Sequence, residues 1–169
     1  MTSNQRMLRL ALSLGRSRMF STRMLIMLPI LLLFIPGMAW GFADPNLQLP
    51  TEQIPETATE TMFLASIGIV FAGTMAAVLI AHDGISRDRM SGVLELRLSQ
   101  PMPRWRQGTV FVLGHWMSIA LPVTLLIIVS MMLVGYRSDM WISFSDAIVF
   151  IIAAALVLLW YTVFALLAS

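Results

Sequence analysis

The charged residues that could do chemistry in this chain are concentrated in one stretch, which reads RDRMSGVLELRLSQPMPRWRQG at positions 87–108. It contains five arginines and two acids, in a chain that is 58% hydrophobic and has no lysine. Charges of both signs beside short aliphatic side chains favour recognition of a partner protein, because complementary charges fix orientation and apolar contacts supply area. The stretch lies between long apolar runs, so its surroundings decide what it can contact.

Catalytic chemistry has little support elsewhere in the sequence. His82 and Asp83 end one apolar run, and His115 lies near the start of the next, where we expect an interfacial position. The apolar runs hold no HExxH motif, no Ser/His/Asp set and no carboxylate pair, which argues against an intramembrane protease or a proton-relay pump. We therefore assign no catalytic or cofactor-binding residue.

Metal binding is equally weakly indicated. Cysteine is absent, so the sequence offers no disulfide framework and no thiolate metal site. The fourteen methionines form no repeated Met-x-x-Met array, and packing or lipid-facing roles are favoured over copper binding. We assign no metal ligand.

The composition indicates a membrane protein. The mean hydropathy is +0.82 and only 12% of the residues are charged, which is outside the range of soluble proteins. Four apolar runs are long enough to cross about 30 Å of hydrocarbon as helices, and they cover 24–40, 62–81, 112–135 and 147–168. Strands of a membrane barrel would alternate apolar and polar residues, which these runs do not. We predict an all-α polytopic membrane protein in which 1–169 form a single transmembrane domain.

The distribution of arginine predicts the topology. Five arginines lie in 1–23 and five in 82–108, and only Arg137 lies elsewhere. The positive-inside rule therefore places the N-terminus and the 82–108 loop in the cytoplasm, and we expect a multi-pass protein of the cell (plasma or inner) membrane. The N-terminus also resembles a secretory signal, with GFA before Asp44 as its cleavage site, although a charged leader of 23 residues is long for that role.

The N-terminal residues 1–23 have a helical periodicity of their own. Polar residues from Gln5 to Ser17 share one side of a helical wheel and apolar residues the other, which predicts a helix lying flat on the anionic cytoplasmic leaflet. Arg18 falls in the middle of the apolar face, so we expect the flat helix to end near Gly15. A basic leader that only sets topology remains an alternative.

The second apolar run carries a stripe of small residues at four-residue steps, Gly68, Ala72 and Ala76. Small side chains let helix backbones approach closely, which is a main source of attraction between helices in lipid. Packing within the chain is favoured, and a subunit interface remains the alternative. The prolines at 29, 36 and 122 are expected to kink their spans.

The charged stretch also has an internal order. Ser91 and Gly92 can end one helix and cap another, and residues 93–99 are compatible with about two helical turns. Leu94 and Leu98 would stack at i and i+4 on this short helix. Prolines at 101 and 103 forbid its continuation, and Arg104-Trp105-Arg106 follows. A helix this short is marginal alone, so we expect it to pack against a partner.

This stretch resembles the cytoplasmic loop between the second and third spans of the permeases of type-2 ABC exporters. The charged lead is residues 87–89, GVLE at 92–95 turns into the helix, 96–99 form its body, and Pro101 with Arg104 forms the exit. The resemblance implies that the short helix is a coupling element docked in a groove of a separate ATP-binding subunit. The docking residues it implies are Arg89, Gly92, Leu94, Glu95, Leu98, Pro101 and Arg104. It also implies a counterpart of the flat N-terminal helix and a second permease copy, as a homodimer or heterodimer.

The chain departs from this family in two places. The family has Gly-Lys leading into its third span, whereas this chain has Gly114-His115, further along the sequence. The family has six spans and this sequence has four, so we expect a truncated form of a longer permease.

We therefore predict a permease subunit of an ATP-driven exporter that is not itself an enzyme. A chain without lysine cannot supply a GxxxxGK[ST] phosphate-binding loop, so ATP hydrolysis belongs to a partner chain. The alternative is a non-transporting membrane anchor or assembly factor that docks a cytoplasmic partner through the same loop. We expect the lipid bilayer and no nucleic acid among the partners, because the positions of the arginines beside the spans already account for them.

Overall fold

The computed structural model describes residues 3–44, 55–82, 88, 90, 92 and 103–169. All the regular structure in these residues is helical. The helices in chain order are α1 (Ser3–Met19), α2 (Thr22–Phe42), α3 (Ala58–Gly68), the π-helical segment η1 (Ile69–Gly73), α4 (Thr74–Ala81), α7 (Arg104–Ser138) and α8 (Phe144–Leu167). Because α3, η1 and α4 follow one another without a break, they form one long helix, Ala58–Ala81.

Four of these helices are long and apolar enough to cross a membrane: Thr22–Phe42, Ala58–Ala81, Arg104–Ser138 and Phe144–Leu167. They confirm the prediction of an all-α polytopic chain, and they indicate a membrane protein with transmembrane helices. The predicted third span, 112–135, lies inside a much longer helix, because α7 begins at Arg104. The predicted kinks at prolines 29, 36 and 122 do not divide the helices, since α2 and α7 each continue through them.

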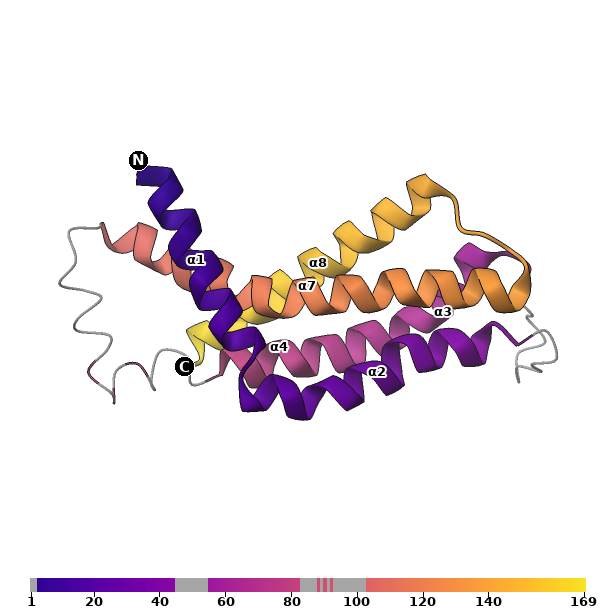
Figure 1. Ribbon diagram of the computed structural model, residues 1–169, viewed down its shortest axis with the longest axis horizontal. Coiled ribbons are helices and arrows are strands. Elements are labelled where there is room, and N and C mark those ends of the chain that lie inside the picture. Colours follow the sequence, from indigo (N-terminus) through magenta and orange to yellow (C-terminus); the bar gives the residue numbers. More distant parts are fainter. Residues whose placement is uncertain (1–2, 45–54, 83–87, 89, 91, 93–102) are drawn as a thin grey trace.

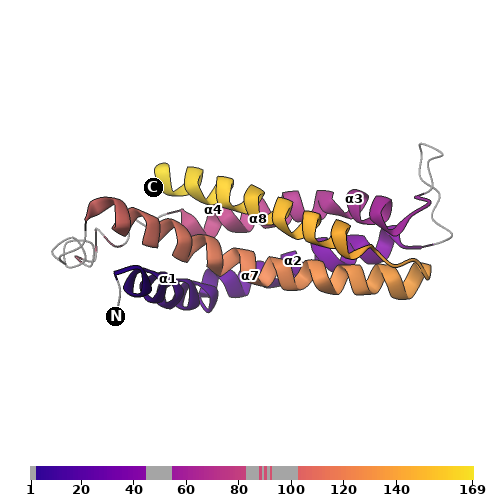
Figure 2. The same cartoon turned by 90° about the horizontal axis from the view of Figure 1, so that it is seen from above.

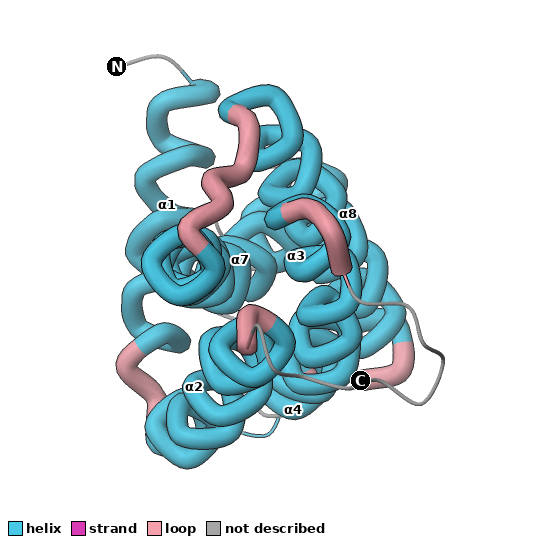
Figure 3. The backbone as a smooth tube through the Cα atoms, turned by 90° about the vertical axis from the view of Figure 1, so that its right-hand side faces the viewer, coloured by secondary structure: helices cyan, strands magenta, loops and turns pink. Residues whose placement is uncertain are grey.

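The long helices run together and the N-terminal helix lies across them. In Figure 1, α2, the helix Ala58–Ala81 and α7 lie along the long axis of the molecule, and α8 crosses at an angle. Figure 2 shows α1 beside the first part of α7, and the end-on view in Figure 3 places α1 on the outside of the bundle, against α7. The end of α4, the start of α7 and the C-terminus are at one end of the molecule, which we call the charged end.

The core is formed where α2, α7 and α8 meet the helix Ala58–Ala81. Its largest fully buried side chains include Leu31, Ile35, Met62, Ile119, Ile127 and Leu158. Apolar side chains also cover the outside, where Leu33, Phe63, Leu125, Val149 and Trp160 are each more than 60% exposed. A soluble protein rarely exposes so many large apolar side chains, whereas lipid solvates them.

The helices differ in how deeply they are buried. In the most apolar part of each, 44% of the residues of Ala58–Ala81 and of α7 are buried, against 22% in α2 and 11% in α8. The first two helices therefore form the centre and α8 is the outermost. A hydrogen bond fixes α8 to the centre, since Trp116 Nε1 donates to the carbonyl oxygen of Ala155 at 2.8 Å.

The small residues of the second span lie inside the protein. Gly68, Ala72 and Ala76 are all buried. A Cβ on Gly68 would lie 2.1 Å from the backbone oxygen of Phe34, so this glycine allows the backbone of α3 to touch that of α2. A Cβ on Gly73 would instead meet Leu158 of α8 at 3.3 Å. The π-helical segment Ile69–Gly73 changes the direction in which the small residues after it face. Gly68 therefore packs against α2, whereas Gly73 packs against α8.

Hydroxyl side chains cap three of the spanning helices. Ser21 accepts a hydrogen bond from the backbone N–H of Met24, Thr57 from that of Glu60, and Ser143 from that of Asp146. Each cap satisfies a backbone donor that the first helical turn leaves unpaired. The starts of α2, α3 and α8 are thus set by local sequence.

An arginine joins α2 and α7 at the end of the molecule opposite the charged end. Arg137 donates to the carbonyl oxygen of Trp40 at 2.9 Å and to the Asp44 carboxylate at 2.5 Å, and its Cζ lies 4.4 Å from the centre of the Trp40 ring. One guanidinium thus combines a helix C-terminus, an acid and an aromatic face. This gives a structural role to the one arginine outside the two basic segments.

Candidate functional site at the charged end

The charged end carries nearly all the basic side chains that the structure describes. They are Arg6, Arg9, Arg16, Arg18, Arg23, Arg104 and Arg106. They come from α1, from the start of α2 and from the start of α7, three elements that the fold brings to one end. The predicted docking loop, 82–108, connects α4 to α7 at this same end.

α1 crosses α7 at two glycines. A Cβ on Gly15 would lie 3.1 Å from the carbonyl oxygen of Gly114, and a Cβ on Gly114 would lie 2.7 Å from Cδ2 of Leu14. The absence of side chains therefore lets the two backbones approach closely. The predicted end of the N-terminal helix near Gly15 is wrong: α1 continues to Met19, because packing on α7 stabilises the turn that follows this glycine.

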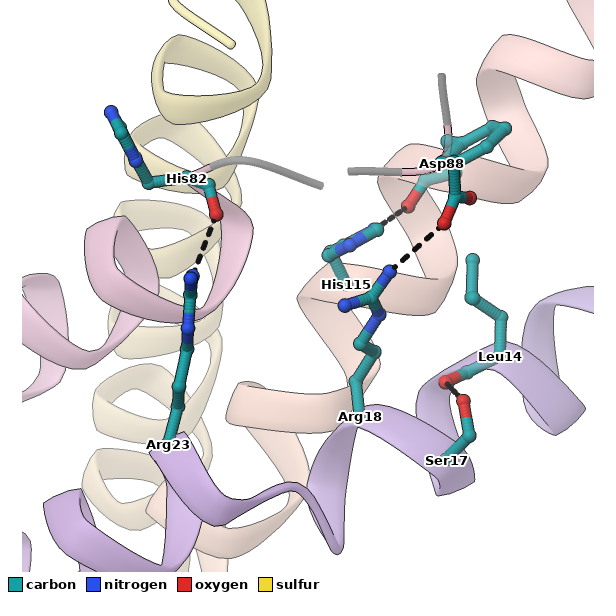
Figure 4. A network of polar contacts seen from close by, with 8 residues as sticks. Leu14, Ser17, Arg18, Arg23, His82, Asp88 and His115 are labelled. Carbon is teal, nitrogen blue, oxygen red and sulfur yellow. Dashed lines mark hydrogen bonds and ion pairs between the residues drawn. The ribbon is translucent and has the colours of Figure 1, made fainter. Parts of the chain in front are cut away.

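Arg18 reaches from α1 to the connection between α4 and α7. Its Nη2 lies 3.5 Å from Oδ1 of Asp88, as Figure 4 shows, and the two side chains are only 17% and 10% exposed. A pair so shielded is screened by salt much less than a surface pair. The sequence places Arg18 on the apolar face of α1, and the structure gives the reason, since that face rests on α7 and Asp88 lies beside it.

Arg23 holds the end of α4. Its Nη1 donates to the carbonyl oxygens of Leu79 and His82, at 3.0 and 2.9 Å. These carbonyls belong to the C-terminal turn of α4, where a positive charge also complements the helix dipole. Two arginines close to the α1–α2 junction therefore hold both the end of α4 and the chain that follows it.

His115, for which the sequence predicts a position near the membrane interface, is buried inside the protein. Its side chain has no exposed surface, and Nδ1 lies 2.8 Å from the carbonyl oxygen of Phe111, one turn earlier in α7. Because a carbonyl only accepts, Nδ1 carries the proton in this contact. The sequence does not reveal this burial, which arises because α7 begins well before the apolar run and α1 covers the turn containing Gly114 and His115.

The structure describes only two of the predicted docking residues. Gly92 has a φ of +70°, a left-handed conformation that glycine adopts readily, which suits the predicted break before a new helix. Arg104 is exposed and is the first residue of α7, directly after Pro103. The predicted short helix at 93–99 lies outside the described residues. So do the remaining docking residues, which are Arg89, Leu94, Glu95, Leu98 and Pro101.

The start of α7 exposes a mixed aromatic and cationic surface. Trp105 is 65% exposed, and Cζ of Arg106 lies 5.1 Å from the centre of its ring. Large exposed aromatics and arginine are the residues enriched at protein interfaces, and indole is also favoured at the membrane surface. The sequence grouped Arg104, Trp105 and Arg106 with the loop, whereas the structure makes them the first turn of the longest helix.

The contacts at the charged end connect helices to one another. Among the described residues, no group of three or more His, Asp or Glu side chains is placed to hold a metal ion. The ion pair of Arg18 and Asp88, the carbonyl contacts of Arg23 and the glycine crossing instead link α1, α4 and α7 into one unit. Sequence patterns did not reveal this unit, although an arginine on an apolar helix face could have suggested a buried acidic partner.

Comparison with known proteins does not extend this description. No protein-family model, curated protein or solved structure matches the chain. The functional interpretation therefore depends on the residues and on the geometry of the charged end.

Proposed function

We propose that this chain is a membrane permease subunit of an ATP-driven exporter, driven by a separate ATP-binding subunit that docks on the 82–108 loop. The observation that carries the proposal is the sequence of the charged stretch between α4 and α7, with its resemblance to the coupling loop of type-2 ABC exporter permeases. The absence of lysine supports a partner as the source of ATP hydrolysis. The membrane would be the cell (plasma or inner) membrane, with the N-terminus in the cytoplasm, as the arginine distribution predicts.

The packing at the charged end supports a route for coupling. The 35 residues of α7 form one continuous helix that starts where the docking loop ends, so movement of the loop would move a rigid element about 50 Å long. Asp88, near the start of the loop, is tied to Arg18 of α1, and α1 in turn rests on Gly114 of α7. A partner that pulls on the loop would therefore move α1 and α7 together.

A second permease copy would complete the transport path in this proposal. Closure of the ATPase subunits on ATP would move the spans on either side of the docking loop in each copy, and a cavity between the copies would change the side to which it opens. A homodimer and a heterodimer both satisfy this requirement. A membrane anchor would bind the same partner, but its binding would not depend on nucleotide.

Charge reversal in the docking loop tests the proposal. Glu95→Arg is expected to weaken co-purification with the ATPase subunit tenfold or more, because like charges placed opposite each other at an interface cost several kcal/mol. The measurement is the amount of ATPase retained on the tagged permease, with transport-coupled ATP turnover as a second readout. An ATPase gene adjacent to that of this chain would identify the partner to co-express in this test.

Glu56→Arg provides the matched control, since it makes the same charge change at the opposite end of the molecule, where Glu56 is exposed. It is expected to retain the ATPase as the unmodified chain does. Unchanged retention and turnover in Glu95→Arg would contradict docking through this loop. An equal loss of the ATPase in Glu95→Arg and Glu56→Arg would also contradict docking through this loop.

A further inference from the structure

A groove lies between α1 and α7 beside their crossing. Its volume is about 210 Å³, and its lining residues are Leu12, Gly15, Arg16, Met19, Met117 and Leu121. This volume is below the roughly 300–1,000 Å³ of pockets that enclose a drug-sized ligand, so it suits one part of a longer molecule.

The two walls of the groove follow the periodicity of their helices. On α1, Leu12, Arg16 and Met19 are spaced at i, i+4 and i+7, and on α7, Met117 and Leu121 are spaced at i and i+4. Met117 and Leu121 follow Gly114 toward the middle of α7, so the groove leads from the crossing into the apolar part of the helix. Leu121 is 52% exposed, and Leu125, one turn further along, is 64% exposed. A chain of methylene groups could therefore continue along α7 beyond the groove.

The mouth of the groove is cationic. Arg16 is exposed, and among the residues that the structure describes its side chain forms no ion pair. Residues 1–43 include five arginines and no acid, so no acidic side chain of α1 or α2 offsets the charge of Arg16. A ligand for this site therefore has an anionic group joined to an apolar chain.

The same charges argue against a second copy of the chain as the occupant. Two α1 helices placed together would bring their exposed arginines close to each other, and like charges oppose association. A peptide helix with its side chains is about 10–12 Å across, which is large for a groove of about 210 Å³. A phospholipid requires only a phosphate at Arg16 and one acyl chain between Met117 and Leu121.

A second cavity at the charged end does not have this character. Its volume is about 390 Å³, and Arg23, Ile26, Met27, Leu79 and His82 line it. Here the arginine donates to the last carbonyls of α4, whose negative helix end disfavours an anion. The groove under α1 is therefore the better anion site.

We propose that the groove between α1 and α7 binds one anionic glycerophospholipid, with its phosphate at Arg16 and an acyl chain against Met117 and Leu121. The bound lipid fills the space beside the Gly15–Gly114 crossing and holds α1 on α7. This site is independent of the ATPase proposed above, so its test requires only the purified chain.

The test is native mass spectrometry of the purified protein in a mild detergent, titrated with phosphatidylglycerol or with phosphatidylcholine of the same acyl chains. One phosphatidylglycerol is expected to bind at least fivefold more tightly than phosphatidylcholine. Arg16→Gln should remove this preference, since one basic side chain at an anionic surface contributes about 1 kcal/mol, or a factor of about five. Arg6→Gln makes the same change on the exposed side of α1 and should retain the preference.

Two further variants test the apolar part of the site. Leu121→Trp fills the groove and is expected to weaken binding of both lipids, whereas Leu33→Trp, at an exposed position on α2 outside the groove lining, leaves binding unchanged. Inorganic phosphate at millimolar concentration should not displace the lipid if the acyl chain contributes.

Several outcomes would overturn the proposal. Equal affinity for the two lipids, or equal losses in Arg16→Gln and Arg6→Gln, would show a diffuse charge effect. Displacement by inorganic phosphate would indicate that the site binds an anion and does not bind an acyl chain. A lipid-free dimer that Leu121→Trp dissociates would identify the groove as a contact between copies.

Discussion

Gly68→Ala is expected to destabilise the protein by about 1–3 kcal/mol, the usual cost of adding atoms to a packed interior. Alanine normally stabilises a helix by about 1 kcal/mol relative to glycine, so the sign of the effect is diagnostic. The steric clash makes the variant less stable, because the added Cβ would lie 2.1 Å from the backbone oxygen of Phe34. A backbone atom cannot rotate away as a side chain can. The measurement is unfolding of the detergent-solubilised protein followed by the fluorescence of its five tryptophans.

Gly37→Ala is the matched control, since Gly37 lies on α2 close to the same crossing. A Cβ there would meet its nearest atom, the Leu32 oxygen, at an ordinary 3.7 Å. This variant should be as stable as the unmodified chain or slightly more stable. If Gly68→Ala were equally stable, α2 and α3 would not be in backbone contact.

Arg18→Glu is expected to release α1 from the rest of the molecule. It places two carboxylates together where a largely buried ion pair lies at 3.5 Å. Breaking a fully buried pair costs about 3–5 kcal/mol, and for this partly exposed pair we expect about 2 kcal/mol. Amide hydrogen exchange in residues 3–19 should then accelerate by about thirtyfold, while exchange in α8 stays unchanged.

The reciprocal change distinguishes the ion pair from a general effect of charge. Combining Arg18→Glu with Asp88→Arg restores opposite charges, so the double variant should recover most of the protection of α1. Asp88→Arg alone should accelerate exchange as Arg18→Glu does. If the double variant were as labile as the single ones, the contact between these two side chains would not hold α1.

The sequence predicts the spans well because hydrophobicity alone determines them. Each of the four apolar runs lies largely within one long helix, and the caps at Ser21, Thr57 and Ser143 are local signals. The start of α7 was missed, since a hydropathy pattern ends where charged residues begin, whereas a helix can continue into water. The helix therefore extends back from the apolar run as far as Arg104, and Pro103 marks the point at which it begins.

The packing at the charged end could not be predicted in the same way. The local sequence favours a helix end near Gly15, but the contact of α1 with α7 stabilises the helix beyond this residue. His115 lies close to the boundary of an apolar run, and that position alone does not reveal that α1 folds over this part of α7 and buries the imidazole. In both cases the decisive contact joins residues about a hundred positions apart in the chain, which no local pattern encodes.

The same packing also explains a charge that the helical wheel left unexplained. Arg18 interrupts an otherwise apolar face, and a lone arginine there would be costly to bury. The ion pair with Asp88 offsets the free-energy cost of burying Arg18. The π-helical segment at Ile69–Gly73 was likewise not foreseen, since the small residues around it follow a regular four-residue spacing in the sequence.

The proposed function requires the charged end to face the cytoplasm, where an ATPase could reach the docking loop. The chain has no cysteine, so single cysteines can be introduced without a background. Met90 is 82% exposed at the charged end, and Ser145 is exposed at the start of α8, at the opposite end. A membrane-impermeant maleimide applied to intact cells should label Ser145→Cys and spare Met90→Cys until the cells are permeabilised; labelling of Met90→Cys in intact cells would contradict the account.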